Sequence, residues 1–98
     1  MEPEARPVRV TIFGQSYALR TRSDPAELEM LAREVDALMD SIASKTGQTD
    51  SARVAVLACL HLADRLRTLE AELVALKQRV EQKSQEFSAL LEHLVEPG

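Results

Sequence analysis

The sequence predicts an α+β fold that is mostly helical. An N-terminal β-hairpin packs on a short helix, and a long C-terminal helix follows and forms an intermolecular coiled coil. Three patterns predict this fold: apolar residues alternate in residues 8–21, recur at helical spacing in residues 25–45, and follow heptads in residues 62–94. Leucine and alanine supply 27 of 98 residues and only 3% are aromatic, which is typical of long helices. We expect a small head in residues 1–50 and a long helix in residues 51–96, whose first part packs with the head.

Composition and charge narrow the class of protein. The net charge is −4, so the chain lacks the dense basic surface that nucleic-acid binding requires. Residues 1–22 nevertheless carry four arginines against two glutamates, and this basic start could meet an acidic protein. No apolar run is long enough to span a membrane, Met1-Glu2-Pro3-Glu4 does not begin a signal peptide, and the single Cys59 cannot form an internal disulfide. We therefore expect a cytoplasmic protein with no membrane or nucleic-acid partner.

The hairpin is predicted from Val8, Val10 and Ile12, which alternate with polar residues. Gly14-Gln15 follows and suits the two central positions of a type II′ turn. The predicted register pairs Ile12 with Tyr17, Val10 with Leu19 and Val8 with Thr21. On the other face this register places Arg9 opposite Arg20, where like charges either invite an anionic partner or extend into solvent.

The short helix has start and stop signals in order. Asp24 can cap it, Pro25 suits the first position, and Glu27 can complete a capping box. Gly47 ends the helix, and Lys45 complements its negative end. Its apolar stripe, expected to cover the hairpin, consists of Leu28, Leu31, Val35, Leu38, Met39 and Ile42.

The long helix carries an apolar seam with alternating spacings of four and three residues. The seam, interrupted once by Lys83, consists of Leu62, Leu66, Leu69, Leu73, Leu76, Val80, Phe87, Leu90 and Leu94. Continued backwards, it takes in Cys59, Ala55 and Ala52. A period of 3.5 residues held this long predicts a left-handed supercoil, and the chain has only one such helix, so a second copy must supply the other.

Charges beside the seam favour a parallel dimer. With Leu66 at heptad position a, Arg65 of one chain meets Glu70 of the other, and Glu72 meets Lys77. Each exposed pair contributes only about 0.5 kcal/mol, so this preference is weak. Leu91 and several alanines widen the apolar stripe, which would allow two dimers to form a tetramer.

No arrangement of residues predicts catalysis, a cofactor or a metal site. His61 and His93 lie 32 positions apart on one rod. Cys59 has no histidine three or four positions away, the helical spacing at which one could activate it. Asp36 and Asp40 are neighbours on one helix face and are expected to be solvated acids. We expect no enzyme.

Three stretches resemble the ZapA family of bacterial cell-division proteins, which associate with the FtsZ ring. VTIFGQSY in residues 10–17 resembles the opening strand and turn of the family. The first helix of the family is similar to Val35-Asp36 with Met39 and Ile42. The entry into its long helix is similar to DSARVAVL in residues 50–57, followed by Leu60, Leu62 and Ala63. The resemblance covers about residues 8–70 and implies no enzyme activity.

The resemblance implies a cytoplasmic regulator of septation at the division site. Dimers formed through the long helix would join antiparallel into tetramers, bind FtsZ filaments through their heads and bundle them, promoting assembly of the Z-ring. Family members often have a basic residue after the hairpin glycine, where this chain has Gln15, so the expected contact shifts to other charged head residues. These are Arg9, Arg20 and Arg22, and more weakly Lys45, Asp50 and Arg53. The alternative is a coiled-coil adaptor or holdase whose rod binds a different protein.

Overall fold

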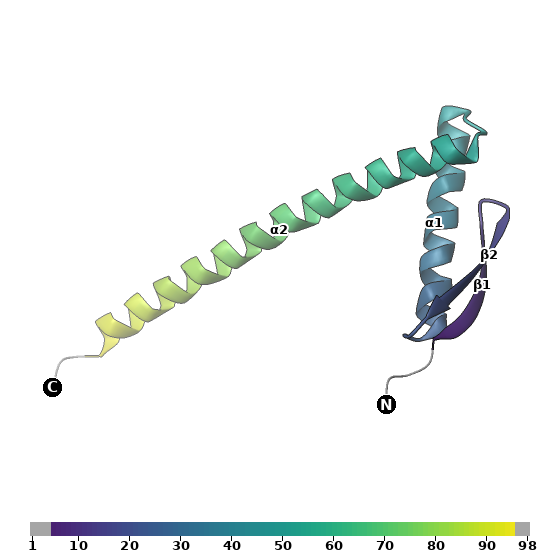
Figure 1. Ribbon diagram of the computed structural model, residues 1–98. Coiled ribbons are helices and arrows are strands. Elements are labelled where there is room, and N and C mark those ends of the chain that lie inside the picture. The colour runs from purple at the N-terminus through teal and green to yellow at the C-terminus, as the bar shows by residue number, and fades with distance from the viewer. Residues whose placement is uncertain (1–4, 96–98) are drawn as a thin grey trace. The chain divides into compact units, whose positions relative to one another are not determined.

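The computed structural model describes residues 5–95, which form a hairpin and two helices (Figure 1). Strand β1 (Arg6–Ile12) pairs antiparallel with β2 (Gln15–Thr21), and helices α1 (Pro25–Thr46) and α2 (Ser51–Leu94) follow. This confirms the predicted fold class of a hairpin packed on a helix and followed by a long helix. The chain divides into two compact units after His61, within α2. Met1-Glu2-Pro3-Glu4 and the expected helix end at residue 96 lie outside the described residues.

The hairpin register differs from the predicted one by two residues. Val10 lies opposite Tyr17 and Val8 opposite Leu19, and Arg9 pairs with Ala18 instead of Arg20. The two turn residues are Phe13 and Gly14, with φ of 50° and 75°. Positive φ at both central positions defines a type I′ turn, so the predicted type II′ turn was wrong.

Tertiary contacts of Phe13 explain the difference. A bulky residue rarely adopts positive φ, which is why the sequence favoured Gly14 at the first turn position. In the folded chain Phe13 packs beside the cluster around Met39, and its backbone N–H donates to Asp36 Oδ1 at 2.7 Å. A shift of two residues also keeps the apolar side chains on one face, so both registers satisfy the strand pattern.

Helix α1 begins and ends where the sequence predicts. Asp24 is the N-cap, and its carboxylate accepts from the Ala26 N–H at 3.0 Å. Pro25 occupies the first helical position. At the other end, Gly47 adopts the left-handed conformation, with φ of 70°, and its N–H donates to Ala43 O. These are local signals, so they do not depend on the rest of the fold.

The hairpin packs on α1 mainly through β1. Val8 and Val10 are buried against Ala32, whose small side chain lets the strand approach the helix. The predicted stripe did not include Ala32, and its member Leu31 is 57% exposed. Helix α1 therefore covers only the β1 half of the apolar face and leaves the β2 half open.

A second cluster joins α1 to the first turns of α2. Met39 is buried against Val54 and Ala58 of α2. Asp50 caps α2, because its carboxylate accepts from the Ala52 N–H at 3.2 Å. The start of α2 is thereby fixed to the same unit as the hairpin and α1.

The second unit is the remainder of α2, described to residue 95. Every described side chain from Leu62 onward is exposed, including all those of the apolar seam. Lys83, the polar residue within the seam, lies 3.3 Å from Glu86. Within the described residues, no helix is long and apolar enough to cross a membrane.

Candidate interaction surfaces

The polar face of the hairpin carries two of the predicted binding residues. Strand alternation places Arg9 and Arg20 on the face opposite the buried Val8 and Val10. They are not direct cross-strand partners, since Arg20 pairs with Pro7. The expected repulsion between directly opposed arginines is therefore absent, and both side chains remain exposed on one face.

Helix α1 brings a further arginine to the same region. A hollow of about 280 Å³ is lined by residues of β1 and α1: Arg9, Val10, Thr11, Glu29, Ala32 and Arg33. Sequence reasoning missed Arg33. The sequence shows that Arg33 directly follows Ala32, but it does not show that Ala32 contacts β1. That contact places Arg33 beside Arg9. The head thus offers two guanidinium groups and one carboxylate around a shallow hollow.

The remaining predicted residues divide between the two ends of α1. Arg22 lies just before α1, whereas Lys45 lies in its last turn. A helix of 22 residues is about 33 Å long. Asp50 and Arg53 lie beyond the same end as Lys45 and form an ion pair of 3.6 Å. The six predicted residues therefore do not form one patch.

Asp50 has a structural role that competes with partner binding. It caps α2, and its second carboxylate oxygen faces Arg53. Replacing it would weaken the start of α2, whatever it contacts in a complex. Within the part of the chain that the structure describes, Arg9 and Arg20 form no comparable capping bond or ion pair, which makes them the cleaner candidates.

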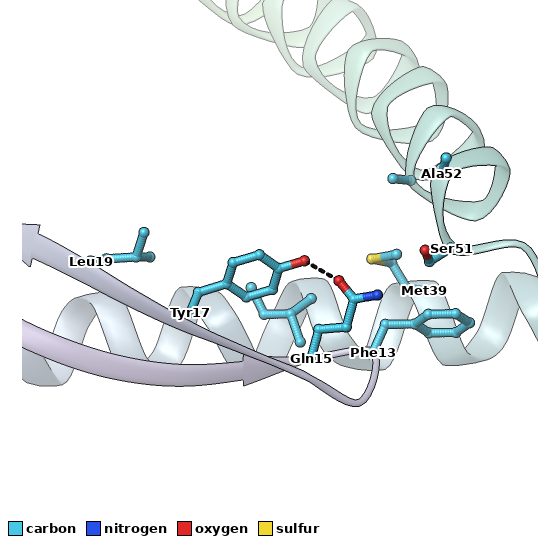
Figure 2. A pocket seen from close by; sticks show the side chains of 9 residues that line it. Phe13, Gln15, Tyr17, Leu19, Met39, Ser51 and Ala52 are labelled. Atoms are coloured by element: carbon cyan, nitrogen blue, oxygen red, sulfur yellow. Dashed lines mark hydrogen bonds between the residues drawn. The ribbon is translucent and has the colours of Figure 1, made fainter.

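An apolar hollow of about 400 Å³ opens on the other side of the hairpin (Figure 2). Its lining residues come from the hairpin, α1 and the first turns of α2: Ile12, Phe13, Gln15, Tyr17, Leu19, Met39, Ser51, Ala52 and Ala55. The Tyr17 hydroxyl donates to Gln15 Oε1 at 2.7 Å along this hollow. The Gln15 side chain therefore lies on the apolar side of the hairpin, and not on the face that carries Arg9 and Arg20.

The described residues contain no group of three histidine, cysteine or acidic residues that could hold a metal ion. Asp36 differs from the expected solvated acid, because it is half-buried and accepts the Phe13 N–H. Cys59 is exposed in the single chain.

Comparisons with known proteins agree with this architecture. Residues 8–96 match the family model described as "Cell division protein ZapA". Cell division protein ZapA of Halalkalibacterium halodurans is 30% identical over 76 residues, which cover 78% of this chain and 84% of that protein. The ZapA of Geobacillus kaustophilus is 28% identical over 82 residues, covering 84% of this chain and 89% of the relative. Among solved structures, a ZapA mutant dimer from Geobacillus stearothermophilus matches with a TM-score of 0.60 and 27% identity, over 80% of this chain and 91% of the other.

Proposed function

Because this chain belongs to the ZapA family of cell division proteins, we propose that it binds FtsZ filaments through its head and cross-links them as a dimer or tetramer. It would thereby promote Z-ring assembly during septation, in the cytoplasm at the division site. No enzymatic step is part of this function. Self-association and a filament-binding head are the two parts of the proposal.

The exposed seam of α2 is the observation that carries self-association. Within the described chain, nothing covers the leucines from Leu62 to Leu94. A heptad seam of this length is buried by a second helix in a coiled coil. The similar structure from Geobacillus stearothermophilus is itself a dimer, which supports the same assembly here.

Three exposed arginines of the head support the proposed filament binding. Arg9, Arg20 and Arg33 are exposed on the head and suit an acidic protein surface. One such contact is weak, because exposed charges are screened by salt. An oligomer presents several heads to one polymer, so the contacts act at a high effective concentration and the avidity rises.

Co-sedimentation with FtsZ polymers assembled with GTP tests the proposal. The wild-type protein should pellet with FtsZ and thicken the polymers into bundles. The double variant Arg9→Glu with Arg20→Glu should stay in the supernatant while keeping its helicity and oligomeric mass. Arg67→Glu makes the same kind of charge reversal on the outer face of α2 and should still pellet. Unchanged pelleting of the double variant would remove the hairpin from the contact surface.

The alternative, an adaptor or holdase that binds through its rod, predicts a different result from truncation. A chain ending near residue 70 keeps the head and loses most of the exposed seam. A partner bound by the rod would be lost completely. An FtsZ-binding head would retain weak contact but lose bundling.

A further inference from the structure

The head leaves two apolar surfaces exposed that its own core does not use. On β2, Tyr17 and Leu19 are 42% and 38% exposed on the face that lines the 400 Å³ hollow. On α2, Val56 and Leu60 are 60% and 63% exposed. Val56 and Leu60 do not line this hollow, so the exposed apolar side chains form two separate sets, each of which marks an interaction surface. A single occupant that covers Tyr17 and Leu19 as well as Val56 and Leu60 would account for both sets of exposed side chains.

The first turns of α2 present three distinct faces. Val54 and Ala58 define the first face. Ala52, Ala55 and Cys59 define the second face, and Val56 and Leu60 define the third. The first face is buried in the head's own core. The second continues the heptad seam. At about 100° per residue, the first and third faces lie about 100° to either side of the seam.

We propose that α2 of a second copy lies in the apolar hollow, with its Val56 and Leu60 packed against Tyr17 and Leu19 of the first chain. This inference rests on the proposed self-association and on the parallel pairing that the charges beside the seam favour. Each α2 would then be held on one flank by its own head and on the other by the partner's hairpin. Two-fold symmetry makes the two contacts identical, as in an isologous interface.

The seam supplies the continuity that identifies the occupant as a helix of the same chain. Ala52 and Ala55 line the hollow and also occupy seam positions. Figure 2 shows Ala52 of α2 facing the hollow across from the hairpin residues Tyr17 and Leu19. Alanine at both seam positions lets two helix backbones approach closely. A parallel partner helix that continues the seam to these alanines therefore enters the hollow.

A second copy also accounts for more of the surface than another ligand would. A peptide from a different protein could cover Tyr17 and Leu19, but Val56 and Leu60 would stay exposed. The partner helix covers both sets in one arrangement. The hollow is lined mainly by apolar and small side chains, and its polar side chains are few: Ser51, and Gln15, whose Oε1 accepts a hydrogen bond from the Tyr17 hydroxyl.

Cross-linking between chains tests this arrangement in a two-by-two design. All variants carry Cys59→Ser, so the introduced thiol is the only one. A tagged chain with Leu19→Cys or Ala18→Cys is co-expressed with an untagged chain carrying Leu60→Cys or His61→Cys, and a short bismaleimide is added. Ala18 lies on the opposite face of the hairpin from Leu19, and His61 lies on the flank of α2 away from Leu60. Circular dichroism checks that each variant keeps its helicity, and Tyr17→Cys replaces Leu19→Cys if that chain fails to fold.

The proposal expects covalent tagged–untagged dimers from Leu19→Cys with Leu60→Cys and little product from the other three combinations. Equal cross-linking in all four, or none in any, while sedimentation reports a dimer would overturn the hairpin contact and leave the coiled coil standing. A protein that sediments as a monomer would overturn this inference together with proposed self-association. Filament binding is measured separately by co-sedimentation, so its failure would not be confused with either result.

Discussion

The carboxylate of Asp36 on α1 accepts a 2.7 Å hydrogen bond from the backbone N–H of Phe13, the first residue of the hairpin turn. Phe13 has φ of 50°, a left-handed conformation that costs a non-glycine residue about 1–2 kcal/mol. The hydrogen bond and the packing of the ring beside Met39 offset that cost. One acidic side chain on the helix therefore fixes the turn and, through it, the register of the strands.

Replacing Asp36 by alanine should destabilise the head by about 1.5–3 kcal/mol, the range for a hydrogen bond to a charged group. Asp40→Ala is the matched control, since Asp40 is exposed and one turn further along α1; it should change stability by about 0.5 kcal/mol or less. Urea denaturation at a fixed protein concentration measures both. Equal effects of the two substitutions would show that the Phe13 contact contributes nothing to stability.

Gly47→Ala should cost about 1 kcal/mol, because alanine is strained in the left-handed C-cap conformation. A Cβ at this position meets nothing within 4 Å, so the cost comes from the backbone and not from a clash. Gly47→Asn should cost less, since asparagine tolerates this conformation better. Thermal unfolding at one concentration gives the order. If alanine were tolerated as well as asparagine, the cap would not be left-handed in solution.

Leu69→Glu with Leu76→Glu should convert the protein into monomers, because two buried positions of the seam would each carry a charge. Ala71→Glu with Gln78→Glu places two carboxylates on the outer face of the same helix and should leave the oligomer intact. Sedimentation equilibrium distinguishes the two variants. A dimer that survives the seam substitutions would contradict the heptad assignment.

Cys59 reports the orientation of the helices without any added residue. At a seam position of a parallel dimer, the two Cys59 side chains face each other within reach of a disulfide. Mild oxidation with diamide should then give a covalent dimer on a non-reducing gel, and Cys59→Ser should give none. An antiparallel pair separates the two cysteines, so a purely monomeric band from an oligomeric sample would reverse the orientation.

Arg33→Glu should weaken co-sedimentation with FtsZ polymers, since Arg33 lines the same hollow as Arg9. The expected loss is about tenfold or less in affinity per head, as for one exposed charge at an interface rim. Arg53 lies beyond the C-terminal end of α1, and Arg53→Glu serves as the comparison. A larger loss from Arg53→Glu would move the filament contact to the junction between α1 and α2.

The helices could be predicted from the sequence because their ends depend on local chemistry. Asp24, Pro25 and Gly47 set the bounds of α1 through their own backbone preferences and capping bonds. The hairpin register could not be predicted in the same way. Its turn is stabilised by Asp36, which is 23 residues away along the chain, and the alternating pattern fits either register.

The candidate site was predictable only in part for a similar reason. Arg9 and Arg20 were identified from strand alternation and charge. Arg33 was missed because its place beside Arg9 depends on how β1 packs against Ala32. The predicted pairing of Arg9 with Arg20 across the two strands was wrong, although both residues do lie on the polar face.

The core of the head is small: among the described residues, its buried hydrophobic side chains are Val8, Val10, Ala32, Met39, Val54 and Ala58. In the proposed coiled coil, the exposed apolar seam of α2 becomes buried only when copies associate. Mass action then applies to folding itself, so the melting temperature should rise with protein concentration. Dilution separates the copies and exposes the seam again, so the stability of the protein depends on how much of it is present, even where a head keeps its own small core.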